Sequence, residues 1–566
     1  MKEYRSGVGP GFRFLAGSLK GGLWFYGVGI VLSSGKALLE SMLSGQLYKI
    51  VIQLCEKTEY KTALIQMGFL AIGLVGVALA QFLGEQMVIK ASLRTDRNLR
   101  STLIRKICRM PEGKRTHYQS GYFSDLFGRD MDVTGEIYKT KWGSMLARLI
   151  SVVGGLWILA RYNVSLTVFC FFCGLVYFVM IFSLKNQAKH IQQQTFAALG
   201  KLSKLMGEIS LGLPIIRFYQ LKDRFDGQYK QSAGDYALLG QKNVRVQTLA
   251  GGLRNFGYSF SYVGILIFGL ALVSRGKQGL DDFMYLWSIG IGVAYAMQSL
   301  GTQMLEYQEN AAALERVMEG CGLEEENQEG SPVEGSDIVF DQASFGYEDK
   351  QILKEVSFAA LKGQKVAIVG SSGGGKTTMV RLMMGFYSPT EGTVSIGGVS
   401  TAEANLRSLR AHIAYLPQMP FLFDESIREN LELALPDAKQ DQSDEKEKKL
   451  YAAIEKAGLD RLLKALPDGL DTVVGENGSK LSGGERQRIG LARCFLKDAD
   501  IYVMDEMTSA LDAKLEEEIV NRLFAEKEKT VICITHRPAA TRHADRVLVL
   551  DQGRIEESSY QKIGTK

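Results

Sequence analysis

Six long apolar stretches before residue 310 constrain the fold of this 566-residue chain more than any other feature. A helix needs about 20 mostly apolar residues to cross the hydrocarbon core of a bilayer. The stretches cover approximately residues 23–54, 63–89, 145–160, 164–184, 256–273 and 283–304. Taken singly, each could be a buried core helix, most credibly the short third and fifth, which have Arg148 and Arg254 nearby. As a set they predict a bundle of six membrane-spanning helices.

Basic residues gather on one side of these predicted spans. The N-terminal segment carries Lys2, Arg5, Arg13 and Lys20, and residues 94–115 form a second basic run. The connectors at residues 56–60, 161–163 and 274–281 hold few basic residues. Because loops rich in Lys and Arg remain in the cytoplasm, the pattern predicts a multi-pass protein of the plasma (cell inner) membrane with a cytoplasmic N-terminus. The first stretch lacks a small-residue cleavage site, which predicts a retained helix rather than a signal peptide.

The second half of the chain carries a phosphate-binding pattern after an apolar run at residues 365–369. Its residues are Gly370, Ser371, Ser372, Gly373, Gly374, Gly375, Lys376, Thr377 and Thr378. Glycines allow backbone N–H groups to line an anion site, the lysine places a charge at the β- and γ-phosphates, and the Thr377 hydroxyl can bind Mg²⁺. The alternative is a glycine-rich turn before an amphipathic helix. The pattern predicts binding of a nucleoside triphosphate.

Two adjacent carboxylates, Asp505 and Glu506, end a later apolar run. An aspartate at a strand end can hold Mg²⁺, and a neighbouring glutamate can take a proton from attacking water. Taken alone, the pair also fits a solvated acidic turn. Its weight comes from the sequence LSGGERQR at residues 481–488 and from His536 after the next apolar run.

In this order, the phosphate loop, LSGGERQR, VMDE, SALD at residues 509–512 and THR around His536 resemble the ABC-type ATPases. The resemblance implies a fold of six exporter-type transmembrane helices followed by an α/β P-loop ATPase domain, with ATP and Mg²⁺ as cofactors. It also assigns roles by position: Tyr347 stacks on adenine, Gln418 and Asp505 contact Mg²⁺ with Thr377, Glu506 is the general base, His536 contacts the γ-phosphate and Asp512 acts across a dimer.

The LSGGE sequence implies that one chain is not enough. Ser482, Gly483, Gly484 and Glu485 would begin a helix, whose N-terminus favours an anion. In the family these groups grip the γ-phosphate bound by an opposing domain, and this chain has one copy of each motif. The resemblance therefore implies a dimer with a second half-transporter, either another copy of this chain or a similar partner.

The division of the chain follows its composition. Residues 1–320 are expected to form the transmembrane domain, residues 321–336 a polar, solvated linker, and residues 337–566 the nucleotide-binding domain. Long connectors after the second and fourth spans resemble the intracellular loops of exporters. Residues 121–133 and 207–219 resemble their two coupling helices. Residues 474–478 resemble an acidic loop that engages those helices, with Asn477 where the family has arginine.

Ionisable and aromatic residues within the predicted spans are candidates for a substrate cavity, because charges inside a membrane are costly and face a cavity or a partner helix. The candidates are Lys36, Glu40, Arg254, Tyr258, Tyr262, Tyr295 and Gln298. Helix packing is the alternative for each of them. Cys170 and Cys173 have the spacing of a metal or redox site, but their apolar surroundings favour membrane packing.

These observations and the resemblance together predict ATP-driven transport, by alternating access, of a small molecule, lipid or peptide. Export is expected, and an importer with the same fold, for a siderophore-like substrate, is the alternative. A third class, the soluble DNA-maintenance ATPases, is disfavoured by the six spans. A net charge of +5 gives no basic field for nucleic acid. The expected partners are a second half-transporter and membrane lipid.

Overall fold

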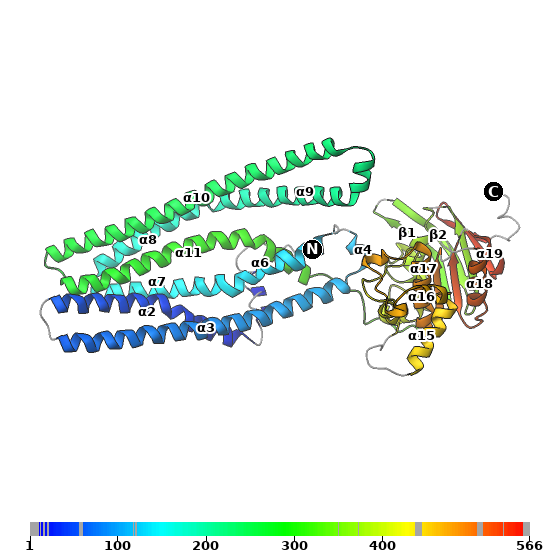
Figure 1. Ribbon diagram of the computed structural model, residues 1–566, viewed down its shortest axis with the longest axis horizontal. Coiled ribbons are helices and arrows are strands. Elements are labelled where there is room, and N and C mark those ends of the chain that lie inside the picture. The colour runs from blue at the N-terminus through cyan, green and yellow to red at the C-terminus, as the bar shows by residue number, and fades with distance from the viewer. Residues whose placement is uncertain are drawn as a thin grey trace. The chain divides into compact units, whose positions relative to one another are not determined.

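The computed structural model describes residues 11–557 except residues 12, 15, 16, 20, 21, 56–59, 117, 119, 120, 349, 372, 436–443, 507–512 and 536. The chain divides into two compact units. The helical unit comprises Met1–Cys108 and Gln119–Leu323, and the mixed unit comprises Arg109–Tyr118 and Glu324–Lys566. In Figure 1 the helical unit runs from blue to green and the mixed unit is mostly yellow to red.

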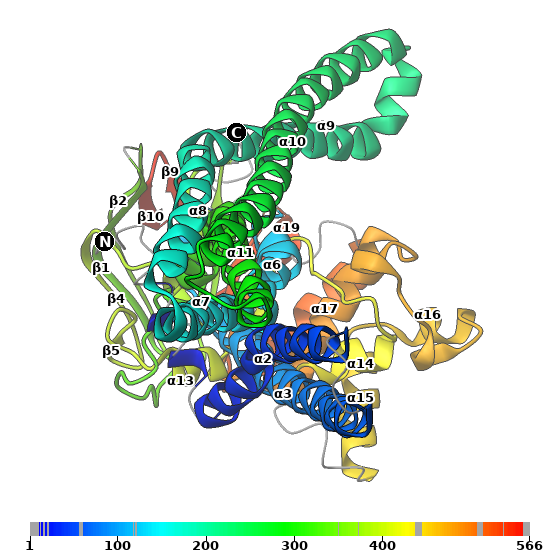
Figure 2. The same ribbon diagram turned by 90° about the vertical axis from the view of Figure 1, so that its left-hand side faces the viewer.

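Long helices make up most of the helical unit. They are α2 (Leu23–Cys55), α3 (Tyr60–Cys108), α7 (Trp142–Tyr162), α8 (Val164–Ser183), α9 (Lys185–Phe218), α10 (Lys222–Ser274) and α11 (Leu280–Cys321). The stretch before α7 is α5 (Tyr122–Asp125), a π-helical segment η1 (Leu126–Asp130), α6 (Met131–Glu136) and a second π-helical segment η2 (Ile137–Lys141). Helices α9 and α10 lie side by side. The C-terminal end of α9 and the N-terminal end of α10, which a short turn connects, diverge from α11 (Figures 1 and 2).

Five helical stretches of the described residues are long and apolar enough to cross a membrane: α3, the stretch from α5 to α7, α8, α10 and the part of α11 up to Met304. Their apolar surface is unusually exposed: Phe69 and Ile72 on α3 are each 70% exposed. Such a surface is costly in water and suits contact with lipid. The predicted first span is also a helix, α2, but it is not among the five, since serines and the charged Lys36 and Glu40 reduce its apolar content.

Close backbone approach joins α2 to α3. A Cβ added to Gly84 would lie 2.6 Å from the carbonyl oxygen of Gly29 and 2.8 Å from the backbone nitrogen of Ser33. Small residues of this kind allow helices to pack tightly in a membrane, where burial from water no longer drives association. A separate apolar core joins α7, α8, α10 and α11 around the fully buried Phe283. Cys170 lies in that core, which agrees with the predicted packing role.

Residues 121–133 do not form a separate coupling helix. They lie in α5, η1 and the start of α6, where Leu126 and Met131 are fully buried in the helical unit. The short helix that follows α3 is instead α4 (Glu112–Arg115), which belongs to the mixed unit. Residues 207–219 form the end of α9, with Pro214 inside it, and lead into the turn before α10.

The described residues of the mixed unit form ten strands and several short helices. The strands are β1 (Ile338–Tyr347), β2 (Lys350–Ala360), β3 (Lys365–Gly370), β4 (Glu391–Ile396), β5 (Val399–Ser400), β6 (Ile413–Leu416), β7 (Ile501–Asp505), β8 (Thr530–Ile534), β9 (Arg546–Asp551) and β10 (Arg554–Glu557). The α-helices after α4 are α12 (Lys376–Met383), α13 (Leu406–Ala411), α14 (Ile427–Glu432), α15 (Asp444–Lys456), α16 (Asp460–Ala465), α17 (Gly483–Lys497), α18 (Ala513–Phe524) and α19 (Pro538–His543). Two 3₁₀ turns, η3 (Gly469–Asp471) and η4 (Glu476–Gly478), precede α17.

A six-stranded sheet, in the order β10-β9-β3-β8-β7-β6, forms the centre of this unit. The pairs from β9 to β6 are parallel, and β10 is antiparallel to β9. Both faces are buried: Val503 on β7 packs with β1 to β4, whereas Met504 packs with α14, α15 and α17. Parallel strands covered on both faces read as continuous apolar runs, as β7 and β8 do. A second, antiparallel sheet has the order β2-β1-β4-β5.

The predicted linker is held against the mixed unit by ion pairs. The Arg410 guanidinium donates two hydrogen bonds to the Glu326 carboxylate, at 2.6 and 2.9 Å, and the backbone N–H of Glu326 donates to the Arg109 carbonyl at 2.7 Å. Val333 is buried among the strands. The segment is therefore docked rather than fully solvated, and the division between the units falls after Leu323.

A buried ion pair fastens α11 to η1. Asp130 is 2% exposed and accepts two hydrogen bonds from the Arg316 guanidinium, at 2.6 and 2.8 Å. We expect Arg316→Met to lower the stability of the helical unit by about 2 kcal/mol, because the buried carboxylate loses the closer of its two cations. The loss is below the ~3–5 kcal/mol of a fully buried pair, because Arg316 is partly exposed and Arg129 stays 3.5 Å from Asp130. Thermal unfolding of the purified protein in detergent measures this change.

The control is Lys230→Met, which removes an exposed pair of similar type, Lys230 with Asp226 at 2.7 Å. An exposed pair of this spacing contributes roughly 0.3–0.5 kcal/mol, so its unfolding midpoint stays near that of the parent. Equal midpoints for the two variants would contradict a structural role for the Arg316 pair.

Candidate functional site

The ends of four parallel strands bring the predicted nucleotide residues together. Strand β3 ends at Gly370, β7 at Asp505, β6 at Leu416 just before Gln418, and β8 at Ile534. Because these strands run in the same direction and are adjacent in the sheet, their carboxyl ends share one edge. Ligands of open α/β sheets bind at this edge.

The phosphate loop follows β3 and leads into α12. Gly373 and Gly375 have positive φ values of 82° and 104°, a conformation in which side chains are strained. The Lys376 ammonium donates hydrogen bonds to the carbonyl oxygens of Gly370 and Ser371, at 2.7 and 2.9 Å. Thr378 is buried at the start of α12. Ser372 lies outside the described residues.

Two hydrogen bonds connect the strand-end residues. The Thr377 hydroxyl donates to the Asp505 carboxylate at 3.4 Å, and the Gln418 amide donates to the Glu506 carboxylate at 2.6 Å. Glu506 has a φ of 51°, which is unusual for a residue other than glycine. Such a conformation is costly, although seven other non-glycine residues of the described chain also have a positive φ.

Gln487 is a residue of this site to which the sequence analysis gave no role. Its side-chain amide donates to the backbone carbonyls of Gln418 and Glu506, at 3.2 and 3.3 Å, and the residue is buried on α17. It therefore fixes the backbone of both catalytic candidates. Its place inside LSGGERQR was the available signal, but the direction of its side chain depends on how α17 packs.

Burial sets the electrostatics of the site. Removal from water raises the pKa of Asp505, and the neighbouring Glu506 charge adds to the effect. Burial also lowers the pKa of Lys376, against the attraction of Glu506 and Asp505. The Thr377 hydroxyl, the Asp505 carboxylate and the Gln418 amide supply the oxygen donors that Mg²⁺ prefers. A divalent cation here would also offset the buried negative charge, so the residues fit the ion.

Tyr347 ends β1 in an aromatic cluster. Its ring meets those of Phe345 and Tyr387 edge to face, with centroids 5.0 and 5.4 Å apart. The Arg381 guanidinium donates to the Tyr347 hydroxyl at 3.2 Å. Gly113 of α4 packs against Tyr387: a Cβ atom added to this glycine would lie 3.2 Å from the Tyr387 ring. Arg381 and Tyr387 were not predicted from the sequence.

The LSGGE residues begin α17 as expected. Ser482 is the N-cap: its hydroxyl accepts from the Glu485 N–H at 3.4 Å, and its own N–H donates to the Glu485 carboxylate at 2.7 Å. This reciprocal pair is a capping box. Ser482 and Gly483 are exposed and Gly484 is half-buried, which leaves the helix end accessible to a ligand. His536 and Asp512 lie outside the described residues.

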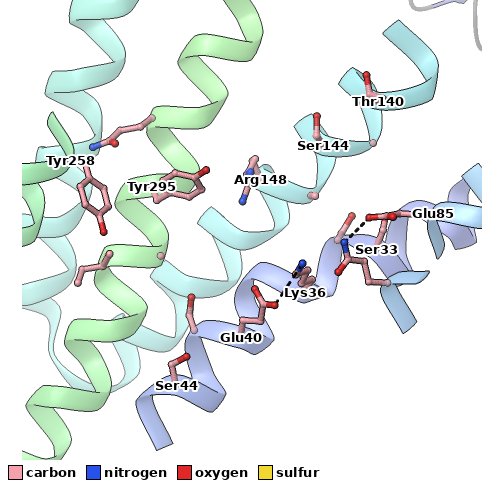
Figure 3. Close-up of a pocket in the computed structure, with 18 of the residues that line it drawn as sticks. Ser33, Lys36, Glu40, Ser44, Glu85, Thr140, Ser144, Arg148, Tyr258 and Tyr295 are labelled. Carbon is pink, nitrogen blue, oxygen red and sulfur yellow. Dashed lines mark hydrogen bonds and ion pairs between the residues drawn. The ribbon is translucent and has the colours of Figure 1, made fainter. Parts of the chain in front are cut away.

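A cavity of about 1240 Å³ opens within the helical unit. Its lining includes all seven residues predicted for a substrate cavity: Lys36, Glu40, Arg254, Tyr258, Tyr262, Tyr295 and Gln298. Figure 3 shows Lys36 and Glu40 on one side and Tyr258 and Tyr295 on the other. The Lys36 ammonium lies 3.8 Å from the Glu40 carboxylate, one helical turn away, as their spacing suggests. Arg148 also lines the cavity.

Two family models match the chain. The model described as ABC transporter transmembrane region matches residues 23–293, and the model described as ABC transporter matches residues 353–509. A solved structure, a bacterial Atm1-family ABC exporter with ATP bound, superposes with a TM-score of 0.83 at 22% identity and covers 97% of this chain and 96% of its own. That likeness confirms the predicted fold of an exporter-type helical domain and an α/β ATPase domain.

The chain is also similar in sequence to several named transport proteins. It is 27% identical over 552 residues to the ATP-dependent lipid A-core flippase of Chromobacterium violaceum, covering 94% of this chain and 93% of that protein. It is 45% identical over 221 residues to the mycobactin import ATP-binding/permease protein IrtB of Mycolicibacterium smegmatis, covering 39% of this chain and 37% of that protein. Several relatives are matched over only about half of their own length or less.

The burial of Asp505 predicts a conflict between stability and ion binding. Its pKa is raised in the folded state, so the stability that this group confers is greatest in acid and is lost as the pH rises through the folded pKa. At neutral pH the charged Asp505 therefore destabilises the fold. We expect Asp505→Asn to raise the unfolding temperature in EDTA by about 2–4 °C and to abolish further stabilisation by Mg²⁺ with ATP.

Differential scanning fluorimetry measures both effects. The control is Asp551→Asn, at the exposed end of β9, which is expected to change neither the midpoint nor the response to Mg²⁺ with ATP. A lower midpoint for Asp505→Asn in EDTA would show that the charged carboxylate stabilises the fold instead.

Proposed function

The chain belongs to the ABC transporter family, and from this we propose that it is an ATP-driven membrane transporter that exports its substrate as a two-chain assembly. The helical unit is its membrane domain, and the mixed unit is its cytoplasmic nucleotide-binding domain. The substrate, the direction of transport and the roles of single residues are parts of this proposal.

The proposal rests on two clusters in one chain. At one sheet edge lie Lys376, Thr377, Asp505, Glu506 and Gln418, and among the apolar helices lies a polar cavity. The first cluster has the groups that hydrolysis of a triphosphate requires: a cation, a donor set for Mg²⁺ and a carboxylate near the attacking water. The cavity in the helical unit offers a binding place for the transported substrate.

Each residue has a defined task in this proposal. Lys376 and the loop N–H groups would hold the β- and γ-phosphates, and Thr377 and Asp505 would hold Mg²⁺, which supplies positive charge against the phosphates when bound. Glu506 accepts a proton from the water that attacks the γ-phosphate. Gln418 holds the Glu506 carboxylate at 2.6 Å, while Gln487 holds the backbone of both residues. Tyr347 supplies a ring for the adenine.

A second copy of the domain is needed to complete the nucleotide site. Ser482 and the N–H groups of Gly483 and Gly484 form an exposed helix end, which is suited to the γ-phosphate held by another chain. His536 would contact the same phosphate, and Asp512 would act across the dimer. Two identical chains would then form two sites, each with an intact Glu506.

Export is the proposed direction. The lipid A-core flippase is matched over nearly its full length, whereas the mycobactin importer is matched over 37% of its length. Import remains the second candidate, because that shorter match has the higher identity of the two. ATP-dependent uptake of substrate into inside-out vesicles supports export, and uptake into right-side-out vesicles with ATP inside supports import.

Replacement of the proposed base tests the ATPase. We expect Glu506→Gln to reduce ATP hydrolysis by about 10²–10⁴-fold, the contribution of a general base, while ATP binding is retained. Phosphate release and binding of a fluorescent ATP analogue are measured on the same preparation. The control is Glu455→Gln, which is exposed on α15 and keeps parental activity; hydrolysis near the parental rate in Glu506→Gln would refute the assignment.

Assembly has its own test. We expect the chain expressed alone to have the mass of two 62.6 kDa protomers in native mass spectrometry from detergent, and to hydrolyse ATP. Ser482→Arg is expected to abolish hydrolysis without preventing ATP binding, because it obstructs a helix end that acts on the partner's nucleotide. A fully active single protomer would contradict the two-chain site.

A further inference from the structure

This inference rests on the proposed transport function and concerns the chemistry of the substrate. Two walls of the cavity differ in charge. The side formed by α2 and α3 contributes Lys36, Glu40 and Glu85, and Glu136 and Lys139 come from α6 and η2, which lead into α7. The lining residues of α7, α10 and α11 include Arg148 and Arg254 but no carboxylate. We call this second side the arginine wall.

The two arginines of this wall lack counter-ions within the described residues. The Arg148 guanidinium lies 5.1 Å from the centre of the Tyr295 ring, and its Nε has no hydrogen-bond partner. Arg254 forms no ion pair in the same part of the chain. Lys36, on the opposite side, is already paired with Glu40. Figure 3 shows Arg148 directed toward the space between these sides.

Gln298 adds an independent observation. It lines the cavity from α11, is 1% exposed, and neither its amide nitrogen nor its amide oxygen has a hydrogen-bond partner among the described residues. A buried polar group left unpaired costs free energy. Its position in the arginine wall therefore indicates a ligand that carries hydrogen-bonding atoms.

Aromatic rings also line this wall. The rings of Tyr262 and Trp287 meet edge to face with centroids 5.0 Å apart, and the Tyr258 and Tyr262 rings are 6.1 Å apart. Tyr and Trp present large apolar faces with a polar group at one end. The arginines and these rings together match a molecule with both a charged group and an apolar or aromatic body.

We propose that the transported substrate is an amphipathic anion, whose carboxylate or phosphate binds Arg148 and Arg254 and whose body packs on Tyr262, Trp287 and Tyr295. Guanidinium groups bind these anions through paired N–H donors. Gln298 completes the polar contacts. Charged residues inside a membrane domain are costly and mark substrate pathways, which accounts for arginines kept without carboxylate partners.

Binding of matched probes tests the charge requirement and the source of the anion. The full-length protein is placed in nanodiscs of phosphatidylcholine and titrated calorimetrically, with empty discs as the blank. The lipid arm compares 1-oleoyl lysophosphatidate with neutral 1-oleoylglycerol. The soluble arm compares 2-naphthyl phosphate with 2-naphthol. We expect the anion to bind at least about tenfold more tightly than its neutral twin in one arm, which identifies the source.

Variants locate the binding group. Arg148→Gln and Arg254→Gln are each expected to weaken binding of the anion about tenfold, with no effect on the neutral twin, and Arg148→Lys to lose less than Arg148→Gln. The control is Arg161→Gln: Arg161 lies on the same helix with its guanidinium 5.2 Å from the Trp157 ring, but outside the cavity. Arg161→Gln keeps parental affinity.

Two results overturn the inference: equal affinity for anion and neutral twin in both arms, or equal losses in Arg148→Gln and Arg161→Gln. If Arg148→Gln fails to fold, Arg254→Gln and the fall of parental affinity with added salt decide the matter. Binding is measured without ATP, so an anion-binding protein that moves nothing in vesicles refutes the transport proposal and leaves the substrate chemistry supported.

Discussion

The cost of holding charge away from water governs both units of this protein. In the mixed unit, Asp505 and Lys376 are buried close enough to interact. Burial raises the pKa of Asp505 and lowers the pKa of Lys376, which in each case favours the neutral form. In the helical unit, Arg148 lies on an apolar helix against an aromatic ring. A fold retains such groups when a partner or a ligand offsets the cost. Mg²⁺ with a triphosphate fits the first set, and an anion fits the second.

Structural charges in the same chain are handled differently, which makes the contrast informative. Asp130 is buried and receives two hydrogen bonds from Arg316, and Glu326 receives two from Arg410. These carboxylates have their counter-ions within the fold. Arg148, Arg254 and Gln298 do not have such partners in the described chain, although they line a cavity. Satisfied pairs hold elements together, whereas these three unsatisfied groups line the cavity that the proposed substrate would enter.

The sequence predicted the fold and seven of the residues that line the cavity, because both follow from local rules. A charge within an apolar stretch cannot face lipid, so Lys36, Glu40 and Arg254 were expected to share an interior, and all three line the cavity. Helix ends were less predictable: α3 continues to Cys108, well beyond its apolar part, because Leu and Arg favour a helix outside the membrane as well. Arg148 was noted only as a weakness of the third span, since its role depends on Tyr295, which is distant in sequence. The roles proposed for the nucleotide residues stay predictions.

Segment Arg109–Tyr118 gives the chain a physical connection between its two kinds of chemistry. It belongs to the mixed unit, where Gly113 packs on Tyr387 and Tyr387 meets Tyr347 edge to face. Its N-terminal end directly follows Cys108, the last residue of α3, and three residues separate its C-terminal end from α5; both helices belong to the helical unit. A ligand that stacks on Tyr347, as proposed above, would contact a ring that packs on Tyr387, and close-packed side chains transmit displacements. The covalent path then leads from the proposed adenine site into a helix that also lines the cavity, because α3 carries Glu85.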